Sequence, residues 1–270
     1  MTAFQPIMMP PRDALQRAKG EALVTLDSLA RLQRLRQEGS AKAILPGGGA
    51  VPEVVFLNTS GGLTAGDRLR FALDLQGGRA VATTQTAERA YRAEGAMARM
   101  DVQLTVGPDG WLDWLPQETI LFDRAALDRR TLIDLAPGAG CLALEAVVLG
   151  RAAMGETVRQ LRFRDRREIR LSGAPVWIDP LALDDAALDG GPAGLGSARA
   201  FASIVMTGEA PLDPLRRLLD EPGATGAASA FAGRTVVRLL AVDGWPLRRQ
   251  IVRILHILRQ GRPLPRVWQL

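Results

Sequence analysis

The sequence is poor in the residues that most metal sites and nucleophilic active sites need. Its 270 residues contain one histidine, His256, and one cysteine, Cys141. A single cysteine excludes an intramolecular disulfide, and two such ligands are too few for a closed zinc site, which needs about four. A Ser-His-Asp triad could use only His256, and a Cys-His dyad only His256 with Cys141. A metal held by this chain alone must therefore depend on carboxylates.

Long apolar runs are absent as well. A membrane-spanning helix needs about 20 apolar residues, but the longest candidate, residues 141–150, is short and contains Glu145. The N-terminus lacks a basic start followed by an apolar stretch, which is the pattern of a signal peptide. No GxxxxGK[ST] motif occurs either, which excludes a P-loop nucleotide hydrolase. We therefore expect a cytoplasmic protein that has no membrane partner.

Lysine is nearly absent. The 34 basic residues outnumber the 29 acidic ones, for a formal charge of +5, and all of them except Lys19 and Lys42 are arginines. Such a balance invites a nucleic-acid interpretation. However, the arginines are interleaved with acidic residues, and the aromatic residues that could stack on bases are few (7 Phe, 5 Trp and 1 Tyr). We therefore expect solvated surfaces and ion pairs, and no nucleic-acid partner.

What the sequence does contain is an alternation of apolar and polar residues. Residues 69–75 and 100–106 place every second, apolar residue on one face, as a strand with one buried face does. Residues 161–164 and 169–171 repeat this pattern. More continuous apolar stretches predict strands buried on both faces, at residues 54–57, 80–84, 131–135, 142–149 and 236–242. Glycine- and proline-rich turns at close intervals favour a mostly antiparallel all-β architecture.

Helical spacing appears late in the chain. An apolar stripe at this spacing consists of Leu247, Ile251, Ile254, Leu255 and Leu258. Pro246 near its start and Gly261 just past its end support an amphipathic helix. Residues 211–220 are a shorter helix candidate. Residues 23–35 are contested, because leucine at every third position favours a helix by propensity alone.

Three polar clusters stand out against the strands. Asp67 follows a glycine-rich stretch and either caps a turn or presents a rigid carboxylate to a cavity or partner. Glu118 and Asp123 follow two tryptophans, and Glu118 either pairs with an arginine or has a raised pKa among apolar neighbours. Glu145 lies in an apolar strand, where burial would require a partner. Arg151 could supply a structural ion pair, and the alternative is that Glu145 forms a polar wall of an internal passage.

Four motifs follow one another in a distinctive order: GGLTAGDRL at residues 61–69, ATTQTAERAYR at 82–92, WLPQETILFD at 114–123 and LGRAAMGE at 149–156. Together they resemble the UreD (UreH) family of urease accessory proteins. Residues 37–42 (QEGSAK) look like the family's early segment, and residues 262–268 (RPLPRVW) look like its C-terminal ending. The resemblance therefore covers nearly the whole chain.

The resemblance implies a single domain over residues 1–270 with an all-β (mainly β) fold. Short strands would stack in a β-helix-like arrangement, with about two α-helices near the C-terminal half, and residues 23–35 would form strands. It also implies a non-enzymatic, cytoplasmic maturation factor that works with UreF and the GTPase UreG to deliver nickel to the urease apoprotein. No cofactor would be tightly bound, and nickel would only be in transit.

The resemblance also carries individual positions over. The acidic and polar positions that match the family's motifs are Asp67, Thr83, Thr84, Glu118, Asp123, Glu145, Arg151 and Glu156. We hypothesise that Asp67, Glu118 and Glu145 line or guard a polar internal path for nickel. Carboxylates bind nickel more weakly than imidazole or thiolate does, so they suit a path that must release its ion.

Two further hypotheses concern partners and chemistry. The candidate partner-binding residues on the C-terminal helix are Leu247, Ile251, Ile254 and Leu258. The alternative for this stripe is that it only packs on the sheet. The alternative function is an all-β, carboxylate-dependent hydrolase that uses Asp67, Glu118 or Asp123 as an acid/base pair.

Overall fold

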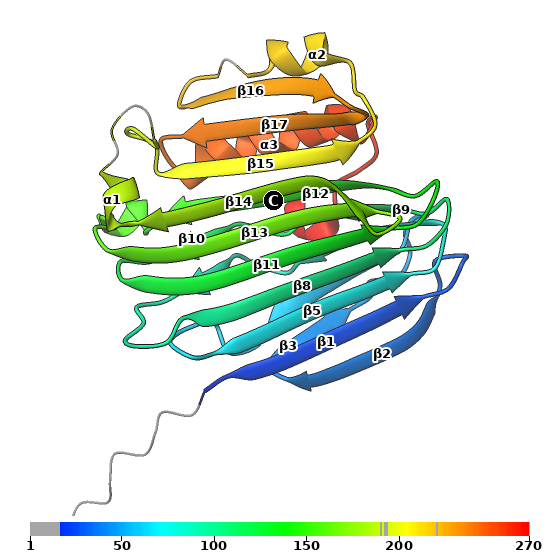
Figure 1. Cartoon of the computed structure of the whole chain (residues 1–270), viewed down its shortest axis with the longest axis horizontal. Coiled ribbons are helices and arrows are strands. Elements are labelled where there is room, and N and C mark those ends of the chain that lie inside the picture. Colours follow the sequence, from blue (N-terminus) through cyan, green and yellow to red (C-terminus); the bar gives the residue numbers. More distant parts are fainter. Residues whose placement is uncertain (1–16, 190, 192–193, 220, 270) are drawn as a thin grey trace, which may run out of the picture.

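Two β-sheets that face each other make up most of the molecule (Figure 1). The computed structural model describes residues 17–269 except 190, 192–193 and 220. Residues 1–16, the first part of the expected domain and the segment without a signal-peptide pattern, lie outside the described residues. Sheet A has the strand order β14 (Ala174–Asp184), β13 (Leu161–Leu171), β11 (Ala125–Leu135), β8 (Ala98–Val106), β5 (Arg68–Leu75), β1 (Lys19–Leu26) and β2 (Leu32–Gly39).

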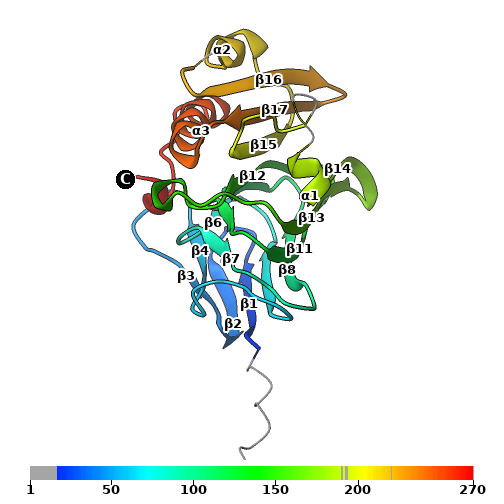
Figure 2. The same ribbon diagram turned by 90° about the vertical axis from the view of Figure 1, so that its left-hand side faces the viewer.

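In the view of Figure 1, sheet B lies behind sheet A and continues above it; Figure 2 shows the two sheets from the side. Its strand order is β16 (Ala224–Phe231), β17 (Arg234–Ala241), β15 (Ala200–Thr207), β12 (Gly140–Leu149), β9 (Trp111–Trp114), β6 (Arg79–Thr84), β4 (Glu53–Asn58) and β3 (Ala41–Ile44). Two short strands, β10 (Thr119–Leu121) and β7 (Glu88–Ala90), pair with each other, and β10 also pairs with β12.

The middle of the chain forms a coil that alternates between the two sheets. From β4 to β13, strands β4, β6, β9 and β12 belong to sheet B, and β5, β8, β11 and β13 belong to sheet A. Within each sheet these strands pair in parallel. One strand from each sheet therefore makes one turn of the coil, and the expected β-helix-like stacking in a mainly β fold is confirmed.

Antiparallel pairing occurs at the ends of the sheets, in β1–β2, β3–β4, β13–β14 and β12–β15–β17–β16. The expectation of a mostly antiparallel architecture is wrong for the coil. There the glycine-rich turns join strands of different sheets rather than neighbours in one sheet; Gly77 and Gly78, for example, lie between β5 and β6. Turn residues therefore identified the chain reversals but not the partner of each strand.

The interface between the sheets is the main apolar core. Phe56 of β4 and Phe71 of β5 stack with ring centroids 4.9 Å apart, and Trp114 of β9 packs edge-on at 6.3 Å from Phe56. As predicted, β6 and β12 are buried along nearly their whole length. Two-sided burial is wrong for β11 and β17, whose residues alternate. The outer face of β11 and the inner face of β17 have no complete covering layer, so one side of each strand contacts solvent.

Three α-helices lie in the described part of the chain: α1 (Asp185–Leu188), α2 (Leu212–Arg217) and α3 (Gly244–Leu258). Both helix candidates are confirmed, since α2 falls within residues 211–220 and α3 contains the apolar stripe. Asp243 caps α3 by accepting a hydrogen bond from the amide of Gly244. Single-turn 3-10 helices occur at Ala152–Met154 and Arg266–Trp268. None of the described helices is long and apolar enough to cross a membrane.

Residues 23–35 form strand β1, a turn and strand β2, which confirms the strand assignment over the helical one. The turn is held by Asp27, whose carboxylate accepts hydrogen bonds from the amides of Leu29 and Arg31, both at 2.9 Å. Leu29 lies in this turn and is 69% exposed. The leucines at every third position therefore do not share a buried face.

Candidate functional site: a buried charged row between the sheets

The candidate positions from the sequence belong to several separate networks. Asp67 closes the glycine-rich turn before β5, and its two oxygens accept hydrogen bonds from the amides of Ala18 and Thr64, both at 2.8 Å. Gly66 has φ +78°, a backbone conformation that favours glycine. Both oxygens of the buried Asp67 are therefore engaged by backbone amides, and Asp67 caps the turn, which is one of the two interpretations that the sequence left open.

Asp123, Glu156 and Arg151 share one network near the ends of β10 and β12. Asp123 accepts hydrogen bonds from the amides of Arg159 and Gln160 at 2.7 and 3.0 Å. Glu156 accepts from the amide of Asp123 at 3.2 Å and from Arg151 Nε at 2.9 Å. Partial burial raises the pKa of each carboxyl, but the hydrogen bonds outweigh burial, so both pKa values lie below their ordinary range. A general acid needs a raised pKa, so this network does not favour a hydrolase that uses Asp123.

Glu118 and the two threonines lie nearer to the C-terminal segments. Glu118 is partly exposed, and its carboxylate is 3.6 Å from Arg248 Nη1 of α3. The hydroxyl of Thr83 donates a hydrogen bond to the backbone carbonyl of Leu115 at 2.6 Å. The hydroxyl of Thr84 accepts a hydrogen bond from the backbone amide two residues after Leu115, at 2.9 Å. Glu118 thus has an arginine partner, and the threonines attach the end of β6 to the following loop.

Glu145 of β12 points into the space between the sheets and is buried. Its carboxylate lies 2.8 Å from Arg129 Nη1 of β11 and accepts hydrogen bonds from Trp114 Nε1 at 3.1 Å and Thr131 Oγ1 at 3.2 Å. The expected ion pair therefore exists, but with a different arginine. Arg151 is on the surface, where it pairs with Glu156. The alignment of the two sheets across the core brings Arg129, not Arg151, to Glu145.

The Glu145–Arg129 pair is one end of a longer series of charges. Arg129 donates to both oxygens of Asp165 of β13, at 3.1 and 2.8 Å. Asp165 lies 3.4 Å from Arg167, Arg167 lies 3.0 Å from Asp179 of β14, and Asp179 accepts from Arg238 of β17 at 2.7 Å. We call this series the buried charged row: Glu145, Arg129, Asp165, Arg167, Asp179 and Arg238.

The buried charged row leads from the interior to the surface. Its inner members are almost fully buried, whereas the side chain of Arg238 is 52% exposed. Burial lowers the pKa of Arg129, but the charges of Asp165 and Glu145 outweigh burial and raise it, so the guanidinium stays charged. Glu145 and Arg167 border a cavity of about 20 Å³, and Arg167 and Arg238 border a wider groove of about 420 Å³ near the surface. The smaller cavity is about large enough for one water molecule.

Sequence reasoning missed most of this row, although the sequence carried a signal for it. In β11 and β13 the buried residues alternate with exposed ones, and Arg129 and Asp165 occupy the same phase as the apolar residues around them. A charged residue in the apolar phase of a strand predicts a buried charge, which needs a partner of opposite sign. A second missed pair is Asp113 of β9 with Arg259, 2.9 Å apart and buried, which holds the end of α3 against sheet B.

The candidate partner-binding stripe of α3 is not on the surface. Its four proposed residues are all buried: Leu247, Ile251, Ile254 and Leu258. They pack with buried residues of β12, β15 and β17 in the second apolar core, on the outer face of sheet B (Figure 2). The expectation that these four side chains form a partner surface is therefore corrected: they are buried against sheet B, which agrees with the alternative that the stripe packs on the sheet. The exposed side of α3 carries other residues, among them Trp245, which is 64% exposed.

The two soft metal ligands lie apart from the buried charged row. Cys141 is buried in β12, and burial raises the pKa of its thiol to about 12, so the thiolate form is disfavoured. His256 is exposed on α3. Among the described residues, no three His, Cys, Asp or Glu side chains converge on a point where they could hold a metal ion. A cation that entered this interior would meet carboxylates already paired with arginines.

Comparisons with known proteins agree on one family. A family model described as "UreD urease accessory protein" matches residues 19–269. A Cereibacter sphaeroides protein named "Urease accessory protein UreD" is 60% identical over 97% of this chain and 98% of its own length. Proteins of the same name from Paracoccus denitrificans and Dinoroseobacter shibae are 57% and 48% identical, over 94% and 95% of this chain and 93% and 94% of their own lengths.

Proposed function

The chain belongs to the UreD family of urease accessory proteins, and from this premise we propose that it is a non-enzymatic scaffold for urease maturation in the cytoplasm. In this proposal it works with UreF and UreG and helps to deliver nickel to the urease apoprotein. Nickel is the cargo of the complex, and this chain passes it on without binding it tightly. The observation that carries the proposal is the buried charged row, which runs from the core between the sheets to a surface groove.

The row is costly if its only role is structural. Replacing buried ion pairs by well-packed apolar residues is often neutral or stabilising, and the surrounding core is otherwise largely apolar. A row of charges with a water-sized cavity beside it is therefore better explained by a need for polar groups inside the molecule. A path for a cation has that need.

The chemistry of the row suits transit rather than storage. Nickel prefers imidazole and thiolate ligands to carboxylates, and the carboxylates of Glu145 and Asp165 are already paired with arginines. Pairing with an arginine lowers the affinity of a carboxylate for a cation, so an ion could leave again quickly. Of the eight candidate positions we retain Glu145 for the path, since Glu118 is partly exposed and pairs with Arg248 of α3, and the contacts of the others hold local turns and loops.

The experiment that tests this proposal uses cells that express the urease genes together with this chain. We expect Glu145→Gln to lower the nickel content of purified urease, while the variant stays folded and co-purifies with UreF as the unchanged chain does. Gln keeps the shape of the side chain and can still accept hydrogen bonds from Trp114 and Thr131, but it has no charge. The matched control is Glu94→Gln, which removes an exposed carboxylate and should leave nickel loading unchanged.

Two results would contradict the proposal at different levels. Normal nickel loading with Glu145→Gln would reject the path through the buried charged row. Normal loading in cells that lack this chain altogether would reject the role in urease maturation.

A further inference from the structure

The outer face of sheet A, opposite the core, carries an ordered set of arginines. Strands β5, β8, β11 and β13 are parallel and in register, so their outward residues form straight lines across the sheet. One line consists of Arg70, Asp101, Arg130 and Arg166, and the next of Arg68, Arg99, Asp128 and Arg164. We call these eight residues the arginine face. Six of them are arginines and two are aspartates, so the face has a strong positive excess.

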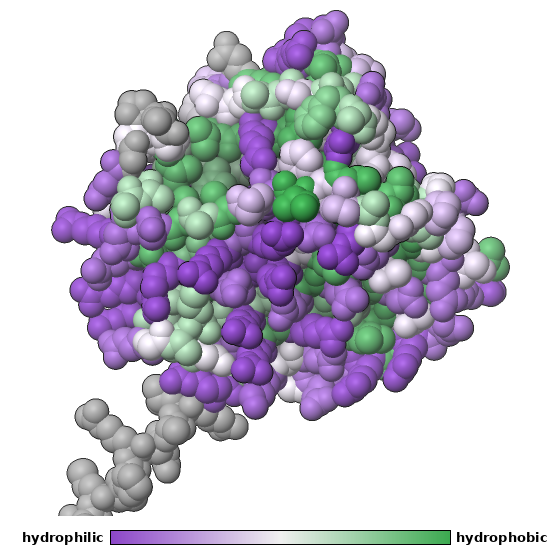
Figure 3. Space-filling model, viewed as in Figure 1, coloured by the Kyte–Doolittle hydropathy of each residue, from purple (hydrophilic) through white to green (hydrophobic). Residues whose placement is uncertain are grey.

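Several of these arginines have no partner in the described part of the chain. Arg68, Arg99, Arg130 and Arg164 are exposed and make no ion pair or side-chain hydrogen bond with any described residue. Exposed arginines without a described partner also occur elsewhere, such as Arg217 of α2, but the arginine face brings four of them together on neighbouring strands. The arginine face is thus a place where available positive charge is concentrated. Figure 3 shows this part of the molecule as a broad hydrophilic area over the middle strands of sheet A.

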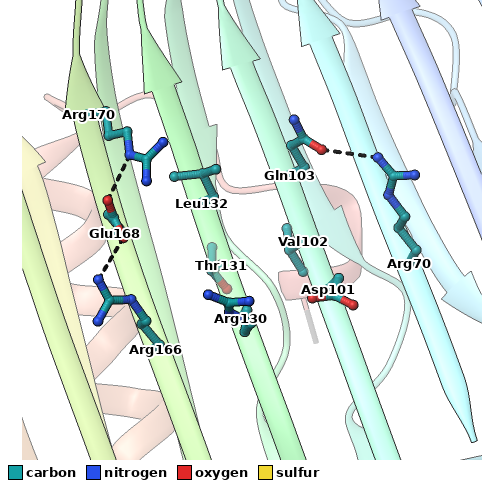
Figure 4. Close-up of a pocket in the computed structure, with 10 residues that line it drawn as sticks. All are labelled: Arg70, Asp101, Val102, Gln103, Arg130, Thr131, Leu132, Arg166, Glu168 and Arg170. Carbon is teal, nitrogen blue, oxygen red and sulfur yellow. Dashed lines mark hydrogen bonds and ion pairs between the residues drawn. The ribbon is translucent and has the colours of Figure 1, made fainter. Parts of the chain in front are cut away.

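The face is hollowed at its centre. A depression of about 350 Å³ is bordered by Arg70, Arg130, Arg166 and Arg170. Figure 4 shows Arg130 in the middle, with Arg70 held by Gln103 on one side and with Arg166 and Arg170 flanking Glu168 on the other. Neighbouring strands lie about 4.8 Å apart, so guanidinium groups on β11 and β13 are close enough to bind one anionic segment together.

We propose that the arginine face docks an acidic segment of a partner protein, with Arg130 at the centre of the contact. Guanidinium groups bind carboxylates through two parallel hydrogen bonds, so a segment rich in Asp and Glu fits this array. Nucleic acid fits it less well. Asp101, Asp128 and Glu168 lie among the arginines and would repel a continuous phosphate backbone, and none of the eight residues is aromatic, so stacking on bases is not provided.

The test measures binding of a fluorescein-labelled oligoglutamate peptide to the full chain by fluorescence anisotropy at low and high salt. We expect binding that weakens as salt rises, and a loss of about fivefold or more in affinity with Arg130→Ala or Arg166→Ala. The control variant is Arg217→Ala, which removes an exposed arginine from α2 at the far end of the molecule (Figure 1) and should change little. Unchanged thermal unfolding of each variant shows that it is folded.

Four outcomes would overturn the proposal. One is no binding of the peptide, and another is an equal loss with Arg217→Ala, which would indicate attraction by net charge alone. Tighter binding of a single-stranded oligonucleotide would identify a nucleic-acid surface instead, and full competition by inorganic phosphate would identify a small-anion site. Urease, UreF and nickel are not in the assay, so its outcome does not depend on the proposed function.

Discussion

Glu88 is the carboxylate in the described structure whose pKa is most clearly raised. It lies in β7 beside a cavity of about 30 Å³, and its Oε1 accepts one hydrogen bond from Asn58 at 3.1 Å. Burial raises its pKa from 4.5 to about 7, and the hydrogen bond from Asn58 opposes this only in part. The neutral acid is therefore the form that the fold prefers.

This shift predicts a pH dependence of stability. The unfolded chain loses the Glu88 proton near pH 4.5 and the folded chain only near pH 7, so the folded state holds more protons between these values and stability falls as pH rises through them. We expect Glu88→Gln, which is neutral at every pH, to gain stability relative to the unchanged chain from pH 4.5 to 7, by about 3 kcal/mol at most. Urea unfolding at several pH values measures the difference. A difference that stays constant with pH would show that Glu88 ionises normally.

Single charged residues also show what could be read from the sequence. The phase of alternation in β11 places Arg129 inside and its neighbour Arg130 outside, and both positions follow from the sequence pattern. The partner of each buried charge does not follow from it. The pairing of Arg129 with Glu145 depends on how the two sheets are aligned across the core, and no local pattern encodes that alignment. For this reason the sequence offered a buried ion pair as one interpretation of Glu145 but named the wrong arginine.

At the scale of elements, α3 is a covering layer whose apolar stripe is part of the core. We expect Ile254→Ala to lower the free energy of unfolding by about 2–5 kcal/mol, because it removes fully buried methyl and methylene groups and leaves a cavity. The matched change Trp245→Ala removes a larger side chain that is mostly exposed, and it should cost less than about 1 kcal/mol. Urea titrations of both variants measure these differences.

Co-purification with UreF separates the covering role of α3 from a partner role. If the outer side of α3 contacts UreF, Trp245→Ala weakens co-purification while stability is kept. Equal stability losses in the two variants would show that α3 does not have one buried and one exposed side.

The elements themselves were largely predictable, and their pairing was not. Alternation located β5, β8 and β13 closely, and helical spacing located α3, because periodicity depends on local sequence. Parallel pairing joins residues that are one coil turn apart in the chain, and period-two alternation looks the same in either strand direction. Here the family resemblance supplied what the pattern could not. Its β-helix-like arrangement was right where the turn pattern alone favoured antiparallel strands.

At the scale of the whole molecule, the coil gives the structure a stable centre and weaker ends. β8 is paired on both sides, with β5 and β11, and every second residue of it is buried. β2 is an edge strand, paired only with β1 within sheet A, and all eight of its residues are exposed. The arginine face lies on the central strands, so it is carried by the part of the sheet that has most support.

This gradient predicts different rates of amide hydrogen exchange along the chain. Opening β2 breaks one ladder and exposes little apolar surface, whereas opening β8 breaks two ladders and exposes the core. We therefore expect the amides of β8 to exchange at least about 100-fold more slowly than those of β2, close to the limit set by global unfolding. Exchange followed by mass spectrometry on peptides from the two strands measures this. Equal protection of β2 and β8 would show that the coil opens as one cooperative unit, and the arginine face would then owe its rigidity to the whole fold rather than to its central position.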